Sequence, residues 1–362
     1  MKHTLDDLRA HAVAQTLFRP TTLAGAMTQL SFVQADPIRA PARAQDLILR
    51  HRAKGYRADD LERYYPSLDI EEGYLYAYGF LPRSLWQLRH PPDRARLSVL
   101  EKRLLEAVHR LGAAHPGDLQ AEFGGRAVNA WGGYSSVAQL ALERLHRRGL
   151  LRVARREKGI RVYEPCPPPA ELPSPQQIFR ELVVTVVKIL APISERSLRT
   201  VLAPLGRSLC SVSDQRAAIT ELLREGQLGE ASVDGHRYIW TARDVARRAS
   251  PKTAEPVPLV RLLAPFDPLV WDRRRFEHLW GWVYRFEAYT PIAKRVRGYY
   301  AMPVSWRHQI IGWANVQRPE GGLDVELGFV DKRPREREFE VQLEAELDRL
   351  RAFLRPRRQR RG

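Results

Sequence analysis

The spacing of apolar residues in the first half of the chain predicts a compact unit of three helices and a hairpin. In residues 98–163, apolar positions recur at helical spacing in three stretches, of which the second is short and starts near Pro116 and the third ends at Gly149. Apolar and polar residues then alternate on both sides of the Lys158-Gly159 pair, as in a β-hairpin. This order is typical of a winged helix, a variant of the helix-turn-helix, and we predict one over residues 98–165.

A second copy of the same pattern follows. Residues 176–249 contain an apolar helix, a short helix that Ser194 would cap, a third helix and two alternating runs. Gly226 occupies the place of Gly149, and Tyr238 that of Tyr163, which gives an internal repeat with an offset of roughly 75 residues. The second hairpin is less basic than the first, so we expect it to be structural rather than a DNA contact.

The two ends of the chain differ from this repeat. Residues 1–97 contain helices without a clear hairpin, and we interpret them as a helical, winged-helix-like domain that could be a degenerate third copy. From residue 257 to 355, short β-rich runs separated by turns predict a small β-barrel or curled sheet closed by a helix, and 356–362 form a basic tail. Proline-rich linkers at 164–175 and 250–258 separate the parts. The predicted fold class is α+β.

Composition adds a strong electrostatic signal. The 362 residues include 44% hydrophobic ones, enough for a core, and carry a formal net charge of +17. Only eight of the 59 basic residues are lysines. Arginine forks pair with phosphate oxygens and stack on bases, so the excess indicates a nucleic-acid-binding protein. The alternative is a genome whose base composition favours arginine codons.

Several classes of protein are excluded or disfavoured. Two cysteines, Cys166 and Cys210, allow neither a disulfide framework nor a cysteine-rich metal site. No apolar run reaches the roughly 18 residues of a membrane span, and the N-terminus has no apolar signal core. Histidines lack ligand spacing and no glycine-rich phosphate loop occurs, so we expect no metal, nucleotide or other cofactor. We expect a soluble protein of a reducing compartment.

The stretch "LSFVQADPIRAP" places Gln34 and Asp36 directly before Pro37. One interpretation is structural: Asp36 caps a helix whose first residue is Pro37. The other is chemical, and the two are compatible, because a helix N-terminus would keep Asp36 ionised. In an extended segment, residues 34 and 36 project to the same side, where a carboxylate and an amide could hold one water molecule. Such a pair suits cleavage of an N-glycosidic bond through an oxocarbenium-like state.

The chain resembles a known family. The stretches "FVQADPIRAPARAQDLILRHR", "GFLPRSLWQLRH", "LLAPFDPLVWDRRRFEHLWGWVYRFEAYTPIAKRVRGYYAMPV" and "IIGWANVQ" are similar to the bacterial winged-helix crosslink-repair DNA glycosylases, the YcaQ/AlkZ-like family. The resemblance implies tandem winged helices and a β-barrel in a C shape around duplex DNA, without metal or cofactor. It implies that Gln34 and Asp36 are catalytic, as in the Gln-x-Asp branch. It further implies excision of N7-alkylated purines and unhooking of interstrand crosslinks by a monofunctional enzyme.

Two departures from the family pattern concern substrate range. Tyr74, Leu75 and Tyr76 stand where the family usually has Trp-Ala-His, and Ala35 stands where a larger apolar residue is common. The resemblance also implies a bacterial, cytoplasmic, nucleoid-associated protein, and we expect a monomer. The alternative function is a non-enzymatic winged-helix DNA-binding protein or regulator, which would usually dimerise on spaced half-sites; the sequence has no obvious dimer helix.

Basic and aromatic side chains outside the Gln34–Asp36 segment are candidates for DNA contacts, chiefly with phosphates. They are Arg39, Arg43, Tyr76, Arg147, Arg148, Arg273, Arg274, Arg275, Lys294, Arg295 and Arg297. The alternative for each arginine run is a solvated basic face. We interpret Asp267 and Asp272 as structural partners of arginines. The alternating aromatic residues at 280, 282, 284 and 286 predict a strand that packs in the core.

Overall fold

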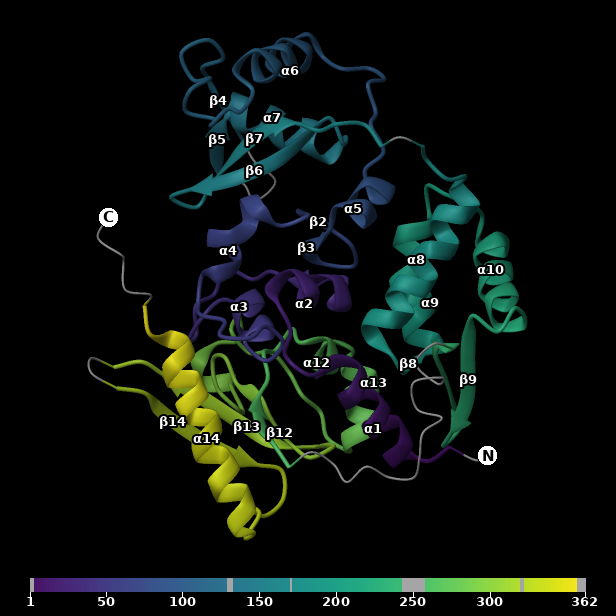
Figure 1. Cartoon of the computed structure of the whole chain (residues 1–362), viewed down its shortest axis with the longest axis vertical. Coiled ribbons are helices and arrows are strands. Elements are labelled where there is room, and N and C mark those ends of the chain that lie inside the picture. Colours follow the sequence, from purple (N-terminus) through teal and green to yellow (C-terminus); the bar gives the residue numbers. More distant parts are fainter. Residues whose placement is uncertain (1–2, 129–132, 170, 243–257, 320–321, 357–362) are drawn as a thin grey trace. The chain divides into compact units, whose positions relative to one another are not determined.

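The computed structural model describes residues 3–128, 133–169, 171–242, 258–319 and 322–356 (Figure 1). The chain forms two compact units, one made of Met1–Asp60 with Ser174–Gly362 and the other of Leu61–Pro173. The second boundary falls inside the proline-rich linker predicted at 164–175. Nearly all of the linker predicted at 250–258 and of the basic tail lies outside the described residues.

The unit Leu61–Pro173 combines hairpins with helices. Its elements are η1 (Tyr65–Ser67), β2 (Ile70–Tyr74), β3 (Tyr78–Pro82), α5 (Arg83–Arg89), α6 (Val99–Leu111), β4 (Arg126–Val128), β5 (Tyr134–Ser136), α7 (Val137–Arg147), β6 (Leu151–Glu157) and β7 (Ile160–Pro165), with α4 (Asp60–Tyr64) at its start. The predicted first and third helices and the final hairpin are present. The short helix predicted near Pro116 is wrong: residues 115–120 form turns closed by i to i−3 hydrogen bonds. The segment is too short to nucleate a helix, and it contains or precedes three glycines, Gly117, Gly124 and Gly125.

Buried glutamates neutralise the arginines of the β6–β7 hairpin. Glu72 accepts hydrogen bonds from Arg156 (2.6 Å) and Arg161 (2.9 Å), and Glu71 accepts one from Arg152 (2.6 Å). Burial alone would raise the pKa of Glu72, but the two guanidinium groups outweigh it and lower this pKa to about 2. Much of the basic ribbon expected from the sequence is therefore paired within the protein.

The second predicted copy lies in the other unit and follows the predicted order of elements. It contains α8 (Pro175–Leu190), β8 (Ile193–Ser194), α9 (Glu195–Gly206), α10 (Val212–Arg224), β9 (Leu228–Val233) and β10 (His236–Thr241). Ser194 caps α9 as expected, accepting from the N–H of Ser197. The β8-β10-β9 sheet is antiparallel.

The repeat is confirmed at its marker residues. Gly149 and Gly226 both end a helix with positive φ, 67° and 70°, and each N–H donates to the carbonyl three residues before it. Only glycine adopts this left-handed backbone without strain. Tyr163 and Tyr238, on the second strand of each hairpin, are both 1% exposed. Equivalent sequence positions therefore have the same structural role in the two copies.

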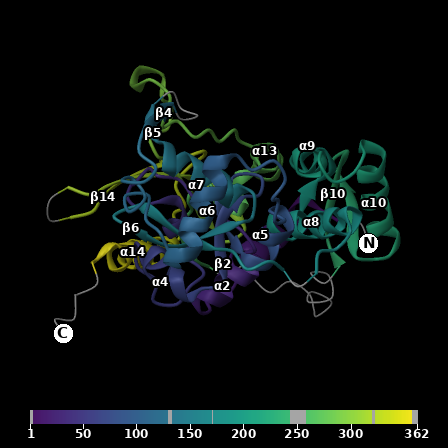
Figure 2. The same ribbon diagram turned by 90° about the horizontal axis from the view of Figure 1, so that it is seen from above.

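The C-terminal part is an open sheet, and the predicted barrel is wrong. The strands β11 (Val260–Leu262), β12 (Met302–Trp306), β13 (Gln309–Gln317) and β14 (Asp324–Phe329) pair antiparallel in that order, and no closed barrel forms among the described residues. The predicted closing helix is α14 (Arg337–Leu354), which lies along this sheet (Figure 1 and Figure 2). Its Phe339 is buried against Trp306 and Phe329.

Helices and an irregular segment occupy the residues that would have closed the barrel. Asp267 and Asp272 cap two short helices, α12 (Pro268–Trp271) and α13 (Arg273–Trp280), and a 3-10 turn, η2 (Ile292–Lys294), follows. The strand predicted for the aromatic run is therefore wrong, although its core role is confirmed for Trp280, Trp282 and Tyr284. Alternating aromatic residues indicate that every second side chain is buried. An irregular segment can bury every second side chain as well as a strand can.

Three helices form the N-terminal part of this unit, and the first of them packs on this core. They are α1 (Leu5–Thr16), α2 (Leu23–Leu30) and α3 (Ala44–Leu49), with β1 (Val33–Gln34) between the last two. Leu8 and Ala12 of α1 contact a buried cluster that includes Val270 and Phe276. None of the described helices combines the length and apolar composition that a membrane crossing needs.

Candidate active site

Gln34 and Asp36 begin an irregular segment that connects β1 to α3. Residues 35–43 form neither helix nor strand, and α3 starts only at Ala44. The prediction that Asp36 caps a helix starting at Pro37 is therefore wrong. Pro41, only four residues later, is incompatible with a helix through this segment because it lacks an N–H donor. Asp36 Oδ1 instead accepts the N–H of Ile38 at 2.9 Å, which closes a local turn.

A residue of α3 fixes the backbone beside the carboxylate. The buried side chain of Gln45 accepts the N–H of Asp36 through its Oε1, at 3.3 Å. On the other side, Gln34 Oε1 is buried and has no hydrogen-bond partner among the described residues. A buried acceptor left in this state costs free energy unless a ligand or water supplies a donor. The segment thus presents a held carboxylate and an acceptor that is ready for a donor.

The electrostatics of Asp36 differ from the sequence expectation. Burial raises the pKa of Asp36, and the hydrogen bond from Ile38 offsets only part of this effect. We expected a helix N-terminus to hold the carboxyl ionised, but that helix is absent. A carboxylate with a raised pKa is a stronger base than an ordinary aspartate, so Asp36 is better suited to accept a proton.

Tyr300 is a third polar group near this segment that sequence reasoning missed. It lies just before β12, it is buried, and its hydroxyl has no hydrogen-bond partner among the described residues. Burial raises the pKa of Tyr300, and the next largest contribution is the charge of Asp36. The phenol therefore lies within electrostatic range of the carboxylate. The motif "GYYAMP" contained this tyrosine, but nothing in its local pattern connected it with residue 36.

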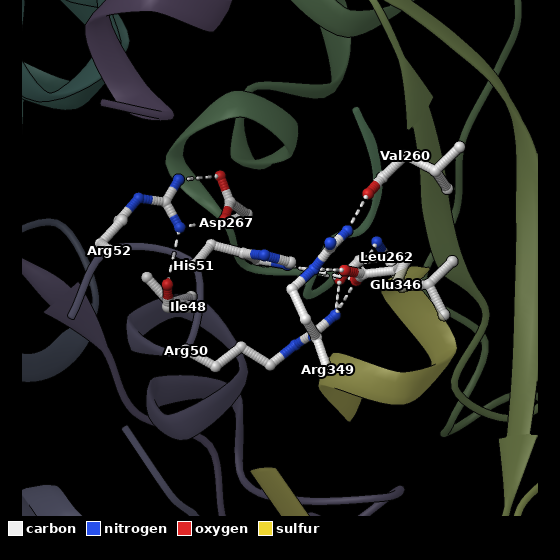
Figure 3. A network of polar contacts seen from close by, with 9 residues as sticks. All are labelled: Ile48, Arg50, His51, Arg52, Val260, Leu262, Asp267, Glu346 and Arg349. Carbon is white, nitrogen blue, oxygen red and sulfur yellow. Dashed lines mark hydrogen bonds and ion pairs between the residues drawn. The ribbon is translucent and has the colours of Figure 1, made fainter. Parts of the chain in front are cut away.

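A buried ionic network fixes the end of α3 (Figure 3). Arg52 makes two hydrogen bonds to Asp267, at 2.8 and 2.9 Å, and Arg50 pairs with Glu346 of α14 at 2.5 Å. His51 between them contacts the Leu262 carbonyl at 3.0 Å, and burial holds its pKa well below the usual value. The interpretation of Asp267 as an arginine partner is confirmed; Asp272 instead caps α13.

Two of the predicted DNA-binding arginines follow Asp36 in the sequence and share one acid. Arg39 and Arg43 contact Asp59 Oδ1 at 3.1 and 2.7 Å. Burial would raise the pKa of Asp59, but these two groups outweigh it and the pKa lies below its usual value. Arg39 is exposed and Arg43 half-buried. A phosphate at this place would have to compete with Asp59 for the two guanidinium groups.

The three arginines of α13 have different surroundings. Arg275 is 1% exposed and donates to the carbonyls of residues 190, 268 and 269, so the prediction that it contacts phosphate is wrong. Arg273 donates to two carbonyls and lies over the Tyr284 ring at 4.5 Å. Arg274 is exposed. The three arginines differ because burial alternates along this turn of the helix. An uninterrupted run of arginines in the sequence does not reveal this difference.

The remaining candidates lie in loops and at a helix end. Lys294 is exposed, Arg295 lies over the ring of Tyr299, and the guanidinium of Arg297 lies over the rings of both Trp282 and Trp313, 5.0 and 5.4 Å from their centres.

The candidates of the other unit are more varied. Arg147 is exposed in the last turn of α7, whereas Arg148 pairs with Asp93 at 3.1 Å. Tyr76 is half-buried in the turn between β2 and β3. Within the described ranges, no group of three or more His, Cys, Asp or Glu side chains is placed to hold a metal ion.

The comparison with protein families identifies the family of the chain. The family model described as "DNA glycosylase AlkZ-like" matches residues 27–353, which include Gln34, Asp36, Gln45 and Tyr300. The match spans most of both compact units, so it describes the chain as a whole and not one domain. The chain therefore belongs to the AlkZ-like DNA glycosylase family and is an enzyme that acts on DNA as a glycosylase.

Proposed function

We propose that this enzyme hydrolyses the N-glycosidic bond of N7-alkylated purines in duplex DNA and unhooks alkyl interstrand crosslinks, with Gln34 and Asp36 as catalytic residues. The observation that carries the proposal is a half-buried carboxylate of raised pKa two residues after a glutamine whose amide oxygen is buried and unpaired among the described residues. An N7-alkylated purine already carries positive charge and leaves with the bonding electron pair, which neutralises it. Such a leaving group needs little help from an acid, so a basic carboxylate and a held water are sufficient.

Each hydrogen and each lone pair of the attacking water would have a partner in the site. Its two hydrogens would donate to Asp36 and to Gln34 Oε1, and Asp36 would take one proton as the C1′–O bond forms. One lone pair attacks C1′. The Tyr300 hydroxyl, which has no protein partner within the described chain, would donate to the other lone pair. Three side chains then fix the water in one orientation, which reduces the entropic part of the barrier.

The ionised carboxylate has a second role. In the transition state the C1′–N bond is largely broken and the sugar carries positive charge. Asp36 lies in a half-buried place where Coulomb interactions are stronger than in bulk water, and it would stabilise this charge. A winged helix at 98–165, together with exposed cations at Arg39 and Lys294, would hold the duplex through its phosphates.

The first experiment uses duplex DNA with a single N7-methylguanine, or with a nitrogen-mustard crosslink, and detects abasic sites by alkaline cleavage. Asp36→Asn and Gln34→Ala should lower the single-turnover rate by at least about 100-fold, the size of a general-base contribution. Binding of the same duplex should persist. Asp348→Asn is the control, because Asp348 is an exposed acid on α14 that pairs with Arg351. Full activity of Asp36→Asn would remove the proposed mechanism.

A further inference from the structure

The segment between α13 and β12 carries an unusual group of exposed apolar side chains. Tyr289, Ile292 and Val296 are 79%, 80% and 76% exposed, although each is large and apolar. They surround the η2 turn, and we call residues 289–296 the apolar tip. Large apolar residues exposed together on one short loop are a mark of an interaction surface.

The tip rests on an ordered base. Buried Glu287 accepts three consecutive backbone N–H groups, at residues 296–298, over 2.8–3.2 Å. Arg295 Nε donates to the Thr290 carbonyl at 2.8 Å, and the side chain of Asn315 on β13 donates to the Arg297 carbonyl at 2.7 Å. A carboxylate is thus used to hold the loop in one conformation. The apolar side chains are presented in place, and little ordering entropy remains to be lost on binding.

Charge and position identify the occupant of the tip as DNA. Lys294 belongs to the tip and is exposed, and the guanidinium of Arg295 stands 5.1 Å from the centre of the Tyr299 ring. A cation among apolar side chains suits a base stack flanked by phosphates, where both kinds of group are satisfied. Tyr300, the phenol influenced by the charge of Asp36, follows the tip by four residues. The same segment therefore leads from the tip to the proposed site of bond cleavage.

We propose that the apolar tip is a wedge that inserts Ile292 and Val296 between stacked bases next to the lesion, while Lys294 contacts a neighbouring phosphate. The proposal rests on the proposed function for the choice of lesion. Opening one base step exposes the sugar C1′ without taking the damaged purine fully out of the helix. The energy of unstacking would come from burying the tip, which is exposed in the free protein.

The test uses an Ile292→Ser/Val296→Ser double variant, with Val341→Ser as control because Val341 is an exposed valine (57%) on α14. The probe is a duplex with 2′-fluoro-N7-methylguanine, which resists cleavage, and 2-aminopurine as its neighbour. Wild-type protein and the control should raise the 2-aminopurine fluorescence on binding, and the double variant should not. A signal that persists in the double variant, or is absent with wild type, overturns the proposal whether or not the enzyme cleaves this lesion.

A second measurement separates opening of the stack from simple binding. The excision rate is compared between a fully paired duplex and the same lesion inside a three-nucleotide bubble. The double variant should lose about tenfold or more on the paired duplex, because unstacking a step is costly, and remain near wild type on the bubble. An equal loss on both substrates would assign the tip to affinity alone and contradict the wedge.

Discussion

Replacing Tyr300 by phenylalanine tests whether this phenol belongs to the catalytic site. The change removes one oxygen from a buried ring that contacts Phe286 edge-on at 5.4 Å and leaves that contact in place. No side chain or backbone group in the described parts of the chain is hydrogen-bonded to this hydroxyl. The variant therefore breaks no bond within the protein, and we expect the free energy of unfolding to change by less than about 1 kcal/mol.

Tyr284 gives the matched comparison. It is also buried, and its hydroxyl donates to the Ala301 carbonyl at 2.6 Å. Tyr284→Phe leaves a buried acceptor without this donor, which costs about 1–3 kcal/mol. For a unit of this size, each kcal/mol lowers the Tm by about 2–4 °C. The two substitutions are chemically identical, but we expect only the second to reduce stability.

Activity should respond in the opposite way. A hydrogen bond to the attacking water that contributes about 1–2 kcal/mol in the transition state corresponds to a rate factor of about 5–30. Single-turnover excision at saturating enzyme should fall by this factor in Tyr300→Phe and stay unchanged in Tyr284→Phe at a temperature where both are folded. A Tyr300→Phe variant with wild-type rate, or one that loses stability as Tyr284→Phe does, would refute the assignment.

Two further predictions concern buried charges. Glu346→Gln should lower the free energy of unfolding by about 3–5 kcal/mol, because it leaves Arg50 buried without its ion pair; urea titration measures this, and a loss below about 1 kcal/mol would contradict it. The pKa of Glu72 is lowered to about 2, so its ion pairs with arginine stabilise the fold above the ordinary glutamate pKa of about 4.5, and this contribution is lost as pH falls from there towards about 2. It amounts to about 3 kcal/mol, so thermal unfolding between pH 5 and 2 should be less pH-dependent in Glu72→Gln than in wild type.

Local patterns were sufficient to predict the repeated elements. Helical spacing, a glycine at the helix end and a tyrosine on the second strand are all short-range signals, and Gly149 and Gly226 adopt the same backbone because the same local rule applies to each. The α14 helix was predicted for the same reason. Turns near Pro116 were mistaken for a helix because a short polar and apolar run carries little information on its length.

Long-range pairing was not predictable in this way. The closure of a sheet depends on which strands find partners. The residues around Asp267 and Asp272 read as a short β-rich run, whereas two side-chain caps start helices there. The burial of Arg275 beside exposed Arg274 is equally invisible in an uninterrupted run of arginines. Each error arose where a tertiary contact decided between local alternatives.

In the candidate site, too, local signals could be read from the sequence and tertiary contacts could not. This difference changes the chemistry expected of Asp36. From the sequence we singled out Asp36 but placed it at a helix N-terminus, where the dipole would lower its pKa and weaken it as a base. In the structure α3 starts only eight residues after Asp36, and Gln45 holds the backbone of Asp36. Burial raises the pKa of Asp36, and the hydrogen bond from Ile38 offsets only part of this effect. A base that must accept a proton from water gains from that rise, as long as it remains ionised at the working pH. At a helix N-terminus, Asp36 would be a weaker base. In the irregular segment it is a stronger base, and this suits the carboxylate to the proposed hydrolysis.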